Sequence, residues 1–167
     1  MDPKKSHYIA VTGIIIKDRK FLITKRSDRE KAFPGLWTVP GGKLESDDYI
    51  NREPDTTAGQ WYNICEDLLK REVMEETGLK IKNIRYLTSL AFIRPDSIPT
   101  FVISLFADYH EGDVKLNNEM SDYRWVTLGE AKDYELIPGI YEELVMLDRI
   151  LKGEKIERWD KNLSQPL

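Results

Sequence analysis

Residues 61–77 most constrain how this chain can fold, because they predict a helix whose buried face continues into carboxylates. On a helical wheel of about 100° per residue, apolar side chains between Ile64 and Leu69 share one face, and Gly78 follows as a C-cap. Three glutamates prolong that face: Glu72, Glu75 and Glu76. The residues expected to point away are Asp67, Lys70 and Arg71. A buried stripe that continues with carboxylates needs a specific reason.

A bound cation is one such reason. The surface of a solvated helix would lie opposite its apolar stripe, whereas these glutamates extend it. Their spacing of three and four residues makes them neighbours, and partly desolvated like charges raise one another's pKa values unless a cation neutralises them. Converging glutamate oxygens are what a hard ion such as Mg²⁺ binds. The pattern predicts a metal site, and the alternative is an ordinary charged helix end.

Most other predicted elements are strands. They cover residues 8–16, 21–26, 81–93, 100–109 and 123–128, and a second, amphipathic helix is predicted over Ile140–Leu151. Pro40, Gly41 and Gly42 are expected to exclude regular structure and to let the backbone approach something closely. Strands that mostly follow one another directly predict an α+β fold with a mixed, largely antiparallel sheet, rather than a doubly wound parallel one.

Size and charge limit the remaining choices. The 167 residues predict one domain, 1–167, with an irregular excursion at 46–60 and a polar C-terminal tail at 153–167. A net charge of -4 argues against broad nucleic-acid binding. Cys65 is the only cysteine and no apolar run reaches membrane-spanning length, so a cytoplasmic protein without a disulfide is expected, as a monomer or homodimer.

Two glycines upstream make the acidic helix specific. Residues 71–79, "REVMEETGL", match the second half of the signature G-x5-E-x7-R-E-U-x-E-E-x-G-U, where U is aliphatic, and "GGKLE" at 41–45 is similar to its opening. The chain therefore resembles the Nudix hydrolases, which implies an α/β/α sandwich. It departs from the signature between Gly42 and Arg71, where it carries about fifteen extra residues.

That insertion leaves two questions open. Asp48 occupies the place of the first signature glutamate, which in the family helps to position the arginine, but Glu45 or another acid of the insertion could take that part. Residues 46–60 would be either a tolerated surface loop or a lid beside the metal site, with Tyr49, Trp61 and Tyr62 as possible contacts.

The resemblance implies roles for individual residues. Glu72, Glu75 and Glu76 would be metal carboxylates for Mg²⁺, or Mn²⁺, and the Gly41 carbonyl a further ligand. Arg71 would orient the carboxylates. Glu119, six residues before Trp125, would be the base or an extra ligand, or else an ordinary loop residue. The candidates for binding substrate phosphate are Arg26 and Lys43, although either could be a solvated charge at the rim.

The implied reaction is metal-dependent hydrolysis of a diphosphate bond in a small nucleotide-type substrate. A nucleoside triphosphate or related nucleoside-diphosphate-linked compound is the leading substrate class. Pro95, sixteen residues beyond Leu79, favours the alternative of an ADP-ribose or nucleotide-sugar pyrophosphatase. A non-catalytic nucleotide-binding domain is a third reading, but such domains usually lose the signature glutamates that this chain keeps.

Overall fold

The computed structural model describes residues 5–94 and 96–163. Pro95, on which the ADP-ribose alternative depends, and residues 164–167 of the predicted tail lie outside the described residues. The two helices are α1 (Ile64–Thr77) and α2 (Ile140–Leu151), and short 3-10 turns cover Ser46–Asp48 and Glu130–Asp133. The strands are β1 Tyr8–Lys17, β2 Lys20–Arg26, β3 Trp37–Thr38, β4 Gly41–Lys43, β5 Lys80–Ile93, β6 Pro99–Glu111 and β7 Met120–Val126.

The strands form one mixed, largely antiparallel sheet, as predicted. Its main order is β3-β2-β1-β6-β5, with β4 also paired to β1 and β7 to β2. Only β1 and β6 run parallel among the described pairs. Since β1 pairs with β2 at one end and with β4 at the other, β4 closes the end of the sheet next to α1.

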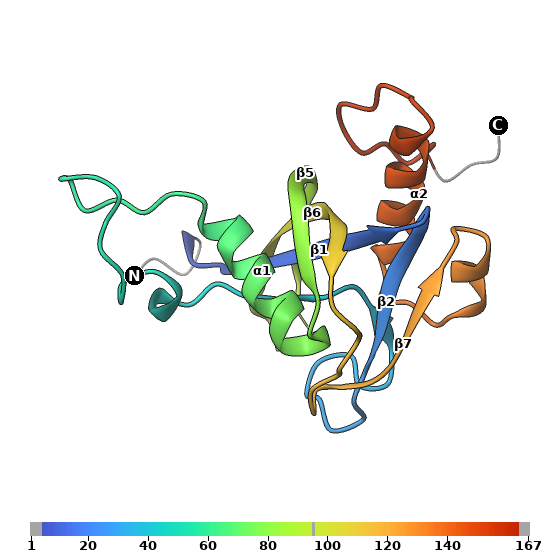
Figure 1. Ribbon diagram of the computed structural model, residues 1–167, viewed down its shortest axis with the longest axis horizontal. Coiled ribbons are helices and arrows are strands. Elements are labelled where there is room, and N and C mark those ends of the chain that lie inside the picture. The colour runs from blue at the N-terminus through green and yellow to red at the C-terminus, as the bar shows by residue number, and fades with distance from the viewer. Residues whose placement is uncertain (1–4, 95, 164–167) are drawn as a thin grey trace.

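The two helices lie on opposite sides of the sheet (Figure 1), which makes the fold an α/β/α sandwich. Alternation along β1 sends Val11 and Ile15 into the core beneath α1, and Ile14 into the core beneath α2. Gly13 lets α1 approach closely, because a Cβ there would lie 2.5 Å from a methyl carbon of Leu69. Within the described ranges, neither helix is long and apolar enough to cross a lipid bilayer.

The prediction of irregular structure at residues 40–42 is wrong. Gly41–Lys43 forms β4, which pairs antiparallel with β1. Pro40 lacks an N–H, but its carbonyl still accepts a hydrogen bond from the Gly13 N–H at 2.9 Å, so the pairing starts directly after it. A Cβ on Gly41 would lie 2.3 Å from the Val11 carbonyl oxygen, so the close approach expected of this glycine is to the backbone of β1.

The boundaries of α1 and β7 and the packing of the tail also differ from prediction. Helix α1 begins at Ile64 rather than at residue 61, because Trp61 and Tyr62 are bound to the preceding loop: the Trp61 indole donates to the Arg52 carbonyl at 3.0 Å, and the Tyr62 N–H to Asp55 at 2.8 Å. Strand β7 begins and ends earlier than predicted, since it pairs with β2. The C-terminal tail was predicted to be polar, but two of its apolar side chains, Ile156 and Leu163, pack against the core beneath α2.

A carboxylate is buried between α2 and the sheet. Glu143 is only 4% exposed, and its Oε1 accepts a hydrogen bond from the Ser104 hydroxyl on β6 at 2.9 Å. Burial raises the pKa of Glu143 to about 7 from its ordinary value of 4.5, against the opposing effect of the Ser104 hydrogen bond.

This carboxyl should make the free energy of unfolding depend on pH. Because the folded protein holds the Glu143 proton more tightly than the unfolded chain, the stabilisation is complete below pH 4.5 and is lost as pH rises through 7. Its size is about 3 kcal/mol. The free energy of unfolding of the natural chain and of Glu143→Gln should be measured by urea at about pH 5 and about pH 8. The advantage of the natural chain over the variant should be smaller at pH 8 than at pH 5, or should reverse in favour of the variant. Parallel pH dependences would contradict the assignment.

Candidate functional site

The site is built where β4 crosses the acidic face of α1. Gly42 lies against Glu72 so closely that a Cβ there would be 2.1 Å from a carboxylate oxygen. The Gly41 N–H donates to Oε2 of Glu76 at 3.2 Å. Gly42 therefore leaves room for the Glu72 carboxylate that a side chain would fill, and Gly41 binds Glu76 through its backbone.

Glu76 is the most deeply buried carboxyl of the site, at 2% exposure. Burial, followed by the charge of Glu72, raises its pKa to about 8, whereas the Gly41 hydrogen bond and the charge of Arg26 lower it. Burial also raises the pKa of Glu72, with Arg71 opposing and the charges of Glu75 and Glu119 adding to the rise. The charges of these carboxylates therefore act on one another, although burial is the larger cause of both raised pKa values.

Glu119 reaches these carboxylates from another part of the chain. The loop before β7 runs along the end of α1, where the Lys115 N–H donates to the Thr77 carbonyl at 2.8 Å and the Asn117 N–H to the Glu76 carbonyl at 3.3 Å. The Glu119 carbonyl in turn accepts the Ser27 N–H at 2.7 Å. These backbone bonds bring Glu119 close enough for its charge to act on Glu72 and Glu76.

Arg71 was predicted to point away from the acidic face, but its guanidinium instead pairs with the carboxylates. Its Nη2 lies 2.8 Å from Asp48 and 2.9 Å from Glu72, and its Nη1 lies 2.9 Å from Glu75. The prediction that Glu75 shares the buried face is also wrong, since its side chain is 54% exposed. Glu75 lies at the margin of the stripe, one helical turn beyond Arg71, where an i,i+4 ion pair forms on the helix surface.

Asp48 is the insertion residue that contacts Arg71. Its Oδ1 accepts from the guanidinium at 2.8 Å, and its Oδ2 accepts the Glu45 N–H at 2.7 Å within a reciprocal capping box. Of the acids considered for the first signature glutamate, Asp48 thus meets the arginine, while Glu45 fixes the turn that presents it.

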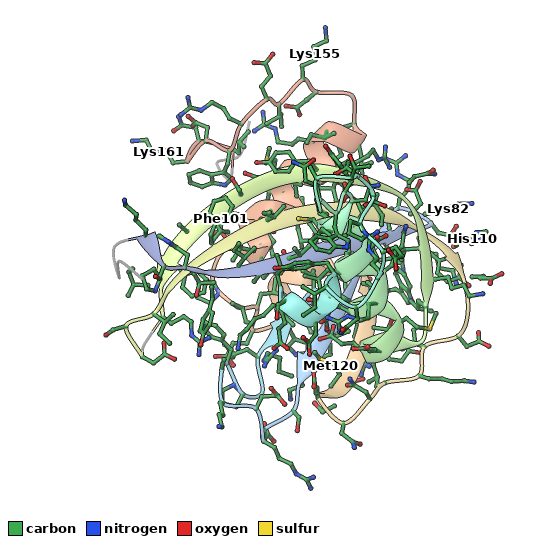
Figure 2. The ribbon with its side chains drawn as sticks, turned by 90° about the vertical axis from the view of Figure 1, so that its left-hand side faces the viewer. Lys82, Phe101, His110, Met120, Lys155 and Lys161 are labelled. Atoms are coloured by element: carbon green, nitrogen blue, oxygen red, sulfur yellow. The ribbon has the colours of Figure 1, made fainter. Side chains whose placement is uncertain are left out.

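The rest of the insertion folds upon itself. The rings of Tyr49 and Trp61 pack with centroids 5.3 Å apart, and Arg52 pairs with Asp55 at 3.1 Å. In Figure 1 this segment stands off from the sheet beyond the start of α1, and Figure 2 shows the molecule from the side on which it projects. The lid role for residues 46–60 stays a prediction.

The two candidate phosphate-binding cations lie in different places. Arg26 is near the carboxylates, as its effect on Glu76 shows, and it donates to Glu30 at 2.8 Å and to the Ala32 carbonyl at 2.7 Å. Lys43 lies on the other face of β4, because Gly42 faces Glu72, and its Nζ is 5.4 Å from the centre of the Tyr8 ring.

The carboxylate oxygens of the site are of the type that binds divalent cations. Among the described residues, no three carboxylate, imidazole or thiolate side chains are close enough together to hold a metal ion, and Arg71 pairs with both Glu72 and Glu75. However, the charges of Glu72 and Glu119 both act on Glu76, and a hard cation would remove the repulsion that contributes to the raised pKa values of Glu72 and Glu76.

Gly41 offers a test of this packing. Gly41→Ala should lower the free energy of unfolding by about 1–3 kcal/mol, because its Cβ would meet the rigid backbone of β1. Gly129→Ala is the matched control, since the nearest atom to a Cβ there lies 4.0 Å away, and a change within about 0.5 kcal/mol is expected. Equal urea midpoints for the two variants would contradict the described contact.

Comparison with known proteins gives a consistent picture. The model of the NUDIX domain matches residues 60–145, just over half of the chain. The NAD-capped RNA hydrolase NudC of Vibrio atlanticus (strain LGP32) is 29% identical over 94% of this chain and 53% of its own length. The nucleoside triphosphatase NudI of Escherichia coli O139:H28 is 29% identical over 75% of this chain and 86% of its own.

Solved structures agree on the fold. The NUDIX domain of Shewanella oneidensis NrtR, solved with ADP ribose, has a TM-score of 0.68 and 19% identity, covering 90% of this chain and 94% of that one. The chain spans between about a fifth and a half of the length of the NudC relatives that it matches.

Proposed function

The chain belongs to the Nudix hydrolase family, and from that premise we propose that it hydrolyses a diphosphate bond in a nucleotide-linked substrate with the help of a divalent cation. The observation that carries the proposal is the buried Glu76 carboxyl, which binds the Gly41 N–H and is affected by the charges of Glu72 and Glu119. Carboxylates grouped around a buried one can hold an anionic diphosphate only through a cation.

The substrate class that the similarities favour is a nucleoside triphosphate or a related compound. The nucleoside triphosphatase NudI supports this choice, because the match extends over 86% of that protein. An ADP-ribose or nucleotide-sugar substrate is the second candidate. The similarity to NAD-capped RNA hydrolases favours it, since NAD contains an ADP-ribose unit, but it covers at most 53% of the NudC relatives cited.

In this proposal the charged residues of α1 have two roles, metal binding and positioning. Glu72, Glu75 and Glu76 would hold Mg²⁺ or Mn²⁺, and the Gly41 carbonyl is proposed as a further ligand. When bound, the cation neutralises phosphate charge and lowers the pKa of a coordinated water. Arg71, anchored by Asp48, would fix the orientation of Glu72, so its role is positioning.

Glu119 and two basic side chains, Arg26 and Lys43, complete the proposed arrangement. Glu119 lies on a loop outside the helix, so it would accept the proton of the attacking water. Arg26, held at the rim by Glu30, would offer its charge to the substrate phosphate. Lys43, on the far face of β4, would contact a part of the substrate that lies away from the reacting phosphorus.

Glu76→Gln tests the metal site. The variant should lose about two orders of magnitude or more in kcat against nucleoside triphosphates with Mg²⁺, and it should lose the rise in melting temperature that Mg²⁺ causes. Without metal it should fold as well as the natural chain, because glutamine has about the size and the neutral charge of the protonated Glu76 carboxyl. Glu66→Gln, on the same helix, is the control. Natural activity in the Glu76 variant, with Mg²⁺ still stabilising it, would rule the site out.

Glu119→Gln tests the base. Because an amide cannot accept the proton, the variant should lose activity and the fall of its remaining rate at acid pH should flatten. Mg²⁺-induced stabilisation should remain within about threefold in apparent affinity, since Glu72 and Glu76 stay in place. Measured pH–rate profiles that coincide with those of the natural chain would show that Glu119 is an ordinary loop residue.

A further inference from the structure

The segment between β6 and β7, residues 112–119, caps the C-terminal end of α1. The last carbonyls of a helix have no partner within the helix, and the Asn117 N–H supplies one for the Glu76 carbonyl at 3.3 Å. Glycine allows the close contact, since a Cβ on Gly112 would lie 2.9 Å from the Gly78 carbonyl oxygen. The end of the acidic helix and this segment are therefore packed as one unit.

Asn117 makes a second contact, through its side chain. Its Oδ1 accepts a hydrogen bond from the Glu119 N–H at 3.0 Å. The same residue thus binds the backbone of Glu76 with its own N–H and the backbone of Glu119 with its amide oxygen. These two hydrogen bonds connect the most deeply buried carboxyl residue of the site to the residue proposed as the base.

The backbone of Glu119 is held on its other side as well. Its carbonyl accepts the Ser27 N–H at 2.7 Å, just beyond the register shift that interrupts the pairing of β2 with β7 between Lys25 and Arg26. Across residues 5–94 and 96–163, no hydrogen bond or ion pair is described for the Glu119 carboxylate itself. A general base needs this combination, because its carboxylate must be free to accept a proton and yet be held within reach of it.

We propose that Asn117 is a positioning residue, whose Oδ1 sets the place of the Glu119 carboxylate relative to Glu76. The amide oxygen fixes the direction of the Glu119 N–H, and with it the direction in which the Glu119 side chain leaves the backbone. A reacting group that is misplaced by about 1 Å can lower a rate by about 100-fold, so this one hydrogen bond bears on catalysis without touching the substrate. The inference rests on the proposed function for the role of Glu119 as the base.

Removing the Asn117 oxygen tests this, because alanine keeps the backbone bond to Glu76. With Mg²⁺ and the nucleotide that the natural chain hydrolyses, Asn117→Ala should lower kcat by about tenfold and leave KM within about twofold. The difference should shrink at acid pH, where Glu119 is protonated in both proteins. Asn117→Asp, which keeps an acceptor oxygen, should recover kcat to within about threefold. Asn118→Ala, at the exposed neighbouring residue, is the control and should keep the natural rate.

A double variant separates positioning from a general structural role. If Asn117 acts through Glu119, then Asn117→Ala should lower kcat by less than about twofold once Glu119→Gln is present. Two losses that multiply would overturn the inference, and so would a natural kcat in Asn117→Ala. If Asn117→Ala does not fold, Asn117→Leu takes its place in the same comparison, because leucine keeps the approximate shape of the side chain without its oxygen.

Amide hydrogen exchange, measured by NMR, distinguishes failure of this inference from failure of the proposed reaction. The Glu119 amide should exchange about tenfold or more faster in Asn117→Ala than in the natural chain, and at the natural rate in Asn118→Ala. Equal exchange in the natural chain and in Asn117→Ala would overturn the positioning by Asn117 even in an active enzyme. The expected difference, in a protein that hydrolyses no nucleotide, would refute the proposed reaction and leave the hold of Asn117 on Glu119 established.

Discussion

The contact between the two glycines of β4 and the two buried glutamates of α1 is the constraint on which the rest of the structure depends. Gly42 leaves room for the Glu72 carboxylate, and the Gly41 N–H binds Glu76. Because β4 is paired with β1 and α1 packs on the same strand at Gly13, small residues on two strands set the distance between helix and sheet. Larger residues would push the carboxylates apart. The same small residues are therefore needed both for packing α1 on the sheet and for the arrangement of the site.

The insertion is compatible with this contact because Asp48 connects it to the site. Asp48 is fixed by its turn and paired to Arg71, which in turn pairs with Glu72 and Glu75. The following loop satisfies many of its polar groups internally, through Arg52 and Asp55 among others. Extra residues placed after that anchoring point can therefore extend outward without displacing α1, in keeping with the small entropic effect of loop length.

Sequence reasoning predicted the sheet class, both helices and most strands, since period-two and helical patterns depend on neighbours along the chain. It also placed Glu72 and Glu76 on the buried face. It failed for Glu75 and Arg71, because residues at the margin of a helical stripe are placed by side-chain pairing that a wheel does not contain. It missed β4, since the pairing of Gly41 with Thr12 is long-range. Glu143 was missed although the same wheel offered a signal: it lies between Ile140 and Leu147 on the apolar face of α2.

The two deeply buried glutamates therefore stand on either side of one strand pair, and their surroundings differ in kind. Glu76 feels the charges of two other carboxylates and receives a backbone N–H, so its environment favours the arrival of a cation. Glu143 receives only the Ser104 hydroxyl among the hydrogen bonds described for its side chain, and burial raises its pKa to about 7, so its environment favours the neutral carboxyl.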